Sequence, residues 1–209
     1  MLLQLDNLDG WESIAAVNPP LALYAAEYWI QHVSAGDIAS SNELQQPMRA
    51  LFQPQSVQFI NWIQIFNIDR PWHPAQLRRS SSTIAPPRYY ASLSGLWGIS
   101  GWLLDGSMDV NAQGGEYGSM LQVASAGGHE AVVQLLLEKN TDVNAQGRFY
   151  GSALQAASAD GHEAVVRLLL ENNADVNSQG GPYGSALQAA SAHGHEAVAQ
   201  LLEVACVNA

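Results

Sequence analysis

Residues 142–171 read DVNAQGRFYGSALQAASADGHEAVVRLLLE, and this stretch decides the fold because the chain contains it more than once. Its opening returns as DVNAQG at Asp109 and as DVNSQG at Asp175, so the interval is 33 residues both times. Between the first two copies 25 of 33 aligned positions are identical, and between the second and third 22 of 28 are identical. Self-similarity at a fixed period of this length indicates a repeat architecture in which each unit packs on the next.

Each copy predicts two short helices separated by a glycine. The segment SALQAAS (152–158) combines small and helix-forming residues with a serine start signal, and Gly161 ends it. The segment HEAVVRLLLE (162–171) is the second helix, and its valines and leucines cover more than one stripe of the helix surface. Such a helix is typical of a unit that packs on neighbours on both sides. A more diverged copy lies upstream, so we expect the array to begin near Pro86.

Units of 33 residues with a small-residue helix, a Gly-His pair, a second helix of the VVxLLL type and a DVN loop resemble ankyrin repeats. The resemblance covers about residues 86–209. It implies an all-α ankyrin-repeat solenoid of helix-turn-helix units with projecting loops, with about four units and the last one truncated. The family's T-P-L-H-x-A reads here as SALQAA (152–157), and we expect the missing proline and histidine to weaken the hydrogen bonding at the helix start.

The last unit differs from the others. It ends LLEVACVNA (201–209), where the preceding unit reads LLLENNADVN (168–177). A repeat buries its apolar face on the next unit, so Val204 and Cys206 need a cover that the sequence does not supply. We therefore expect this unit to be shortened and to fray, and the alternative is that this face pairs with another chain.

The residues before Pro86 contain no copy of the 33-residue pattern. Aromatic and aliphatic residues at helical spacing predict helices over 20–33 and 55–66, with the aromatic rings in a core. We expect a helical N-terminal segment over 1–77 that docks on the first repeat, a linker over 78–86 and repeats over 87–209. The order of PLALYAAEYWIQH, FINWIQIF and DRPWHP before a Ser-rich joint resembles the segment that joins a NACHT nucleotide-binding module to an ankyrin array in fungal NLR-like proteins. No NTPase motif is present in the sequence.

Charge and composition exclude several classes of function. Eight basic and nineteen acidic residues give a net charge of −11, which disfavours binding to nucleic acid or to an anionic membrane. Lys139 is the sole lysine, and its place in a Glu-Lys-Asn turn fits no P-loop, kinase or Schiff-base chemistry. The lone Cys206 suits a reducing compartment, and no apolar stretch is long enough to cross a membrane. We expect an intracellular, cytoplasmic protein, with the nucleus as the alternative.

Candidates for chemistry are few. His129, His162 and His195 recur once per unit, and stacked units lie too far apart for these side chains to share one metal ion, so we expect turn residues that bond to backbone. The Gly-rich loop at Gly114 lacks the lysine of a phosphate-binding loop. We therefore expect no catalytic residue, no metal, no cofactor and no small-molecule substrate. An enzyme would need a site hidden in residues 1–85, and a polar pocket with a perturbed titratable group there would indicate one.

The informative positions are those that vary while the repeat frame stays constant. In the ankyrin family the loop tips and the first-helix surfaces form the concave face that binds partners. The variable loop and helix positions give these candidate partner-binding residues: Glu116, Arg148, Phe149, Asp160, Arg167 and His193. The sequence thus predicts a protein–protein interaction module. The alternative is a fragment or decoy regulator that associates with a NACHT-type NLR-like protein.

Overall fold

The computed structural model describes residues 42–53, 56–66, 68, 84–105, 109–147 and 149–208. Backbone contacts divide the chain into two compact units, Met1–Tyr90 and Ala91–Ala209. The helix predicted over 20–33 and most of the linker predicted over 78–86 lie outside the described residues. The three-part organisation with boundaries at 77 and 86 therefore stays a prediction.

The first compact unit, Met1–Tyr90, contains α3 (Asn42–Leu51) and α4 (Val57–Ile65). The second of these confirms the helix predicted over 55–66, and the Ser56 hydroxyl caps it by accepting the backbone N–H of Phe59. The first was not predicted, and it carries Pro47 in its interior, a residue that usually ends a helix pattern.

Aromatic rings form a core in the compact unit Met1–Tyr90. The buried side chains of Phe52, Phe59, Trp62 and Tyr90 lie with ring centroids 5.6 to 6.4 Å apart in tilted and edge-to-face arrangements. Such pairs add to the apolar area that the rings bury. The prediction that the aromatic residues of this segment belong to a core is confirmed for Phe59 and Trp62.

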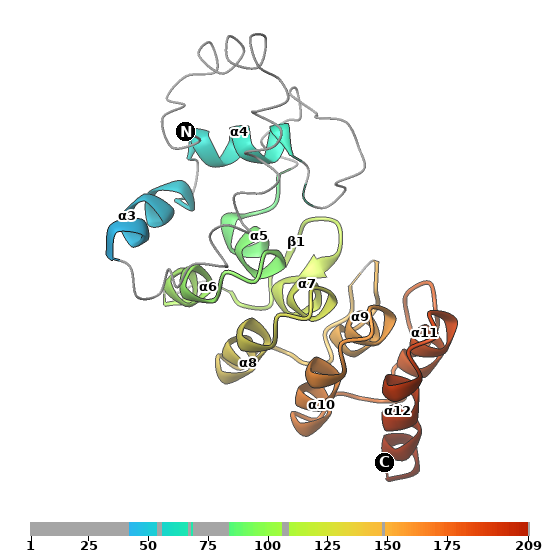
Figure 1. Ribbon diagram of the computed structural model, residues 1–209. Coiled ribbons are helices and arrows are strands. Elements are labelled where there is room, and N and C mark those ends of the chain that lie inside the picture. The colour runs from blue at the N-terminus through green and yellow to red at the C-terminus, as the bar shows by residue number, and fades with distance from the viewer. Residues whose placement is uncertain are drawn as a thin grey trace. The chain divides into compact units, whose positions relative to one another are not determined.

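The remaining helices alternate between two layers (Figure 1). The first helices of the units are α5 (Pro87–Leu93), which spans the boundary between the two compact units, α7 (Met120–Ala126), α9 (Ala153–Ala159) and α11 (Ala186–Ala192). The second helices are α6 (Trp97–Leu104), α8 (Glu130–Glu138), α10 (Glu163–Glu171) and α12 (Glu196–Asn208). Helix α9 packs between α7 and α11, and α10 packs between α8 and α12, so the predicted all-α repeat solenoid is confirmed.

The first helices α7, α9 and α11 begin at a reciprocal cap. In α9 the Ser152 hydroxyl accepts the backbone N–H of Gln155 at 3.2 Å, and the Gln155 side-chain oxygen accepts the Ser152 N–H at 2.6 Å. The same capping box opens α7 and α11. The expectation that this start is weakly hydrogen-bonded is therefore wrong, because serine and glutamine take the roles of the residues that are missing.

The capping glutamines also join neighbouring units. The amide nitrogen of Gln122 donates to the carbonyls of Ala145 and Gly151 in the next loop, at 3.2 and 2.5 Å. Gln155 repeats this with the carbonyls of Gly180 and Gly184, at 3.1 and 2.7 Å. Both amides thereby satisfy carbonyls of the following loop and fix that loop to the helix before it.

The second helices share the apolar core with the first helices. In α10, Val165, Val166 and Leu169 are buried while Leu168 and Leu170 are half-buried, as expected for a helix with neighbours on both sides. Each fully buried valine or leucine contributes roughly 1.5–3 kcal/mol to stability.

The second helices α8 and α10 end at an asparagine in the left-handed region. The φ angles are +58° at Asn140 and +65° at Asn173, a conformation that asparagine tolerates better than most residues. The chain then turns into the DVN loop.

The DVN loops form a ladder of side chain to backbone bonds. The Asp142 carboxylate accepts the N–H of Asn144 within its own loop, and the side-chain Oδ1 of Asn144 accepts the N–H of Asp175 in the next loop. Asn111 does the same for the N–H of Asp142. These bonds explain why the Asp and Asn recur at every unit, since each pair sets the turn and the spacing to the next turn.

The histidines bond to backbone, as predicted. The Nε2–H groups of His129, His162 and His195 donate to the carbonyls of Leu93, Ala126 and Ala159, each in the preceding unit, at 2.9, 2.7 and 3.0 Å. Burial lowers the pKa of His129 below its ordinary value, and the bond to Leu93 opposes this in part. Burial thus favours the neutral imidazole, which still carries the Nε2–H that this bond needs.

The last unit ends in a longer helix than the units before it, and its fraying stays a prediction. Helix α12 runs for 13 residues, whereas α8 and α10 run for 9. Cys206 occupies the position that corresponds to the left-handed Asn173, so the stop signal of the other units is missing and the helix continues. Val204 and Val207 on this extension are 63% and 86% exposed.

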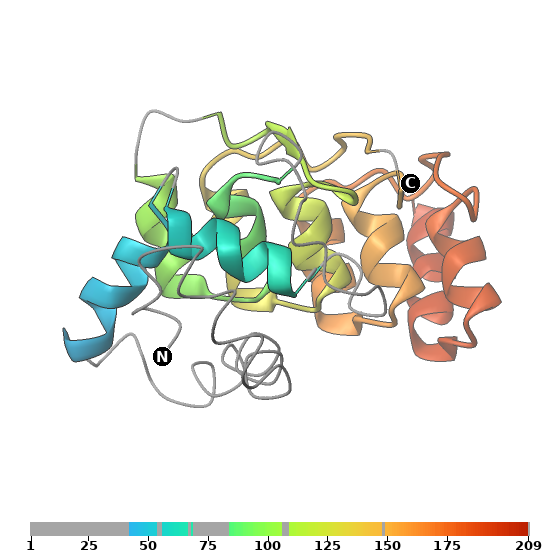
Figure 2. The same ribbon diagram turned by 90° about the horizontal axis from the view of Figure 1, so that it is seen from above.

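Short strands, which the sequence did not predict, shape the first complete loop. Strands β1 (Gln113–Gly114) and β2 (Gly118–Ser119) pair antiparallel, with Gln113 opposite Ser119. The loops that precede the first helices lie along one edge of the helix layers (Figure 2).

Candidate functional site

A row of aromatic rings follows the loops before the first helices. Its members, the aromatic row, are Tyr117, Phe149, Tyr150 and Tyr183. Phe149 packs edge-to-face on Tyr117 and Tyr150, with centroids 5.0 and 4.9 Å apart, and the two tyrosines lie 5.6 Å apart. Phe149 and Tyr183 remain 43% and 36% exposed. Aromatic contact area is thus offered to solvent on neighbouring repeats.

Each of the later two tyrosines contacts the residue that ends its first helix, ten positions further on. The Tyr150 hydroxyl donates to the Asp160 carboxylate at 3.3 Å. The Tyr183 hydroxyl lies 3.3 Å from Nε2 of His193, and the two rings pack edge-to-face at 4.9 Å. In the first complete unit the matching position is Gly127, which has no side chain to offer.

The Tyr150 hydroxyl is held in its protonated form. Burial raises the pKa of Tyr150 strongly, and the negative charge of Asp160 raises it further. The phenol therefore acts as a hydrogen-bond donor to Asp160 throughout the physiological pH range. This bond ties the loop to the end of α9.

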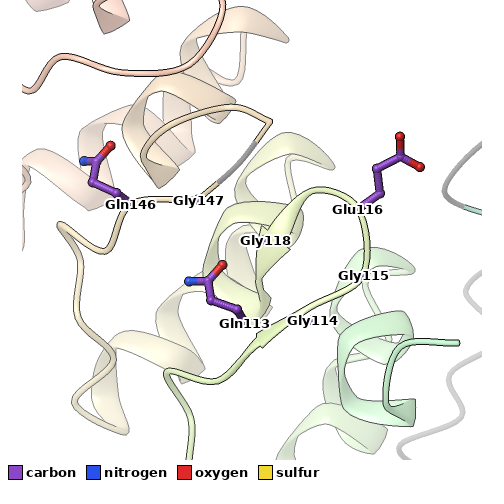
Figure 3. A pocket seen from close by; sticks show the side chains of 7 residues that line it. All are labelled: Gln113, Gly114, Gly115, Glu116, Gly118, Gln146 and Gly147. Atoms are coloured by element: carbon purple, nitrogen blue, oxygen red, sulfur yellow. The ribbon is translucent and has the colours of Figure 1, made fainter. Parts of the chain in front are cut away.

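Glu116 belongs to a pocket of about 650 Å³ between two loops. Its lining is glycine and amide-rich: Gln113, Gly114, Gly115, Glu116, Gly118, Gln146 and Gly147. Figure 3 shows the Glu116 side chain at the tip of the β1–β2 loop, directed away from Gln113. Gly115 and Gly118 have φ angles of +63° and +112°, so the glycines serve the loop conformation.

Four of the six predicted site residues lie in the loops or at the ends of the first helices. These are Glu116, Phe149, Asp160 and His193. Arg167 lies instead on α10, in the layer of second helices, where it forms an ion pair with Glu163 at 2.6 Å. Arg148 lies outside the described residues.

Sequence reasoning missed the tyrosines. Tyr117, Tyr150 and Tyr183 are identical in all three copies, whereas the predicted site residues stand at positions that vary between the copies. A usable signal was present, because an aromatic residue in a Gly-rich loop at a constant 33-residue interval has no helix of its own to pack in.

Nothing in the described ranges points to a metal or cofactor site. No group of three or more His, Cys, Asp or Glu side chains gathers there in a geometry suited to a metal ion. The rings of His193 and His195 stack at 6.2 Å, but their hydrogen bonds go to Tyr183 and to backbone carbonyls. Among the described helices, none has the length and apolar character needed to span a membrane.

Comparison of the sequence with known proteins identifies a family and a relative. The family model for ankyrin repeats, in three copies, matches residues 88–180 and 121–209. The chain is 43% identical over 126 residues to a protein of Monascus ruber described as azaphilone pigments biosynthesis cluster protein L. The aligned part is 56% of this chain and 26% of the relative, so the chain spans about a quarter of the length of that protein.

Proposed function

This chain belongs to the ankyrin-repeat family, and we propose that it is a protein–protein interaction module that binds its partner through the loops and first helices of the solenoid. The family as a whole consists of non-enzymatic interaction modules. Binding rather than catalysis is therefore the function proposed for this chain.

The observation that carries the proposal is the aromatic row. Interface hot spots are enriched in tyrosine, tryptophan and arginine, and large rings give contact area at a small cost in side-chain entropy. Phe149 and Tyr183 offer such rings on neighbouring loops. Asp160 at the end of α9 bonds to Tyr150, which packs against Phe149, and His193 at the end of α11 contacts Tyr183. The repeat frame is constant, while Phe149, Asp160 and His193 stand at positions that vary between the copies.

The loops that carry these rings are held in place before any partner arrives. Gln122 and Gln155 bond to the following loops, and Tyr150 bonds to the end of α9. A surface fixed in this way loses little conformational freedom on binding. The acidic charge of the chain favours association with basic or mixed protein surfaces over nucleic acid or anionic membranes. We propose an intracellular location, in keeping with the single cysteine.

The proposal is tested by capturing partners with the intact chain. The affinity for a captured partner is then compared between the unchanged chain and two variants. Phe149→Pro copies the residue of the third unit and removes one ring of the row. Arg167→Gln copies the other units on the second-helix layer and serves as the matched control. We expect Phe149→Pro to weaken binding of the captured partner by about 1–2 kcal/mol and Arg167→Gln to leave it unchanged. Equal affinity of all three proteins for that partner would remove the aromatic row as the binding site.

The NACHT-partner alternative stays a prediction from the N-terminal sequence. Most of the residues that resemble the NACHT-joining segment lie outside the described ranges, and the relative from Monascus ruber carries no such description. Co-purification of the intact chain with a nucleotide-binding protein would support it. Its absence in the same capture experiment that recovers another partner would argue against it.

A further inference from the structure

The aromatic row lies in a part of the chain that is short of positive charge. Residues 109–209 contain eleven Asp and Glu and three Lys and Arg, a net charge of −8. Two of the three cations are already ion-paired: Lys139, directly after α8, with Asp105 at 3.1 Å, and Arg167, on α10, with Glu163 at 2.6 Å. The third, Arg148, is next to Phe149 in the sequence.

The row also combines ring faces with a carboxylate. Tyr150 and Phe149 lie 4.9 Å apart, and Tyr150 holds Asp160 by one hydrogen bond to Oδ2. Among the described residues this carboxylate accepts its hydrogen bond from Tyr150 at Oδ2, so Oδ1 is left for a ligand. Ring faces attract cations, and a carboxylate beside them adds a charged acceptor.

We propose that the aromatic row binds an extended, arginine-bearing segment of the partner protein. The guanidinium plane stacks on an exposed ring and donates to the Asp160 carboxylate, which a lysine ammonium satisfies less well because it is not planar and is more strongly hydrated. Stacked helices lie about 8–10 Å apart, and three residues of an extended chain span about 10 Å, so arginines at every third position meet successive units. This inference rests on the proposed function and adds the chemistry of the partner to it.

The test uses three fluorescent twelve-residue peptides of Gly and Ser with arginine, lysine or glutamate at every third position, titrated into the intact chain. We expect the arginine peptide to bind, the lysine peptide to bind at least about fivefold more weakly, and the glutamate peptide not to bind. Equal affinity for the arginine and lysine peptides would overturn the stacking, and preference for the glutamate peptide would overturn the charge assignment.

Matched variants locate the binding on the chain. Asp160→Asn should lower the affinity for the arginine peptide at least about fivefold. Glu130→Gln removes the same charge from an exposed position on α8 and should change this affinity less than about twofold. Arg148→Gly should strengthen binding, because it removes a positive charge that is next to Phe149 in the sequence and would repel the arginine peptide. Equal losses in Asp160→Asn and Glu130→Gln would mean unspecific attraction and would overturn the site.

The failure of this inference is distinguishable from failure of the proposed function. If Phe149→Pro abolishes capture of a partner while no arginine peptide binds, the aromatic row is still the interface and its ligand has another chemistry. If the arginine peptide binds and is insensitive to both Phe149→Pro and Asp160→Asn, the aromatic row is not the binding surface and both proposals fall.

Discussion

The imidazole of His162 lies against Gly128 of the preceding unit, so close that a β-carbon on Gly128 would come within 2.5 Å of its Nδ1. The same relationship joins Gly95 to His129 and Gly161 to His195. All three glycines have positive φ angles, so they are needed both for the turn and for the space above it. The Gly-His pair of the sequence is thus a contact between units, with the glycine of one unit receiving the histidine of the next.

This contact predicts different costs for one substitution at two equivalent glycines. Gly128 and Gly194 both have positive φ, but among the described residues nothing lies within 4 Å of a β-carbon on Gly194. Gly194→Ala should therefore cost only the backbone strain, about 1 kcal/mol. Gly128→Ala should cost about 1–3 kcal/mol more, because the ring of His162 must move. Urea unfolding of both variants measures this, and equal losses would show that the histidine yields freely.

The bonds between units predict an asymmetry at the capping glutamines. Gln155→Glu keeps the acceptor for the Ser152 N–H but turns a donor that faces the carbonyls of Gly180 and Gly184 into an acceptor. We expect a loss of about 2–4 kcal/mol in the free energy of unfolding. Gln188→Glu should cost less than about 1 kcal/mol, because Gln188 is exposed and, within the described part of the chain, bonds only within the cap. Similar losses at both positions would mean that the cap, not the link between units, carries the stability.

The buried histidine predicts how stability depends on pH. Burial lowers the pKa of folded His129 below 6.5, so the unfolded chain binds more protons in the range between the two values. This contribution is complete above about pH 6.5 and is lost as the pH falls toward the lower, folded value. Denaturant midpoints from pH 8 to pH 5.5 should fall, and they should fall less in His129→Gln, which keeps a donor and does not titrate. An identical pH dependence in the variant would show that other groups cause it.

The end of the described array predicts a gradient of local stability. Helix α12 packs on α10 and α11, while α10 has α8, α9 and α12 around it, and Ala199 stands where α10 has the buried Val166. Hydrogen exchange should therefore show the amides of residues 187–208 opening well before those of 120–170. The long helix α12 allows the opposite result. Protection there as strong as in α10, and independent of protein concentration, would mean that the extended helix stabilises its own unit.

The sequence alone determined the repeat, its helices and its all-α class, because the signals for these are local or recur at a fixed interval. Ser152 before a run of helix formers, Gly161 at the break and the valines and leucines of 163–171 act within one unit, and the 33-residue interval implies that units stack. The histidines, too, could be assigned to backbone bonds, since equivalent residues on stacked units are too far apart to share a ligand.

Only the tertiary structure decided what happens between units and where the candidate site lies. From the sequence, glutamine in place of the family's histidine predicts weaker hydrogen bonding at the helix start. In the structure Gln155 bonds to carbonyls 25 and 29 residues away. The tyrosines of the aromatic row do not vary, so comparison of the copies passed over them, and their pairing with Asp160 and His193 depends on how each loop folds over the end of its helix. Arg167 varies like the others but lies on the second-helix layer. Sequence shows which positions are free to change, whereas the face on which a position lies follows from the path of the chain between units.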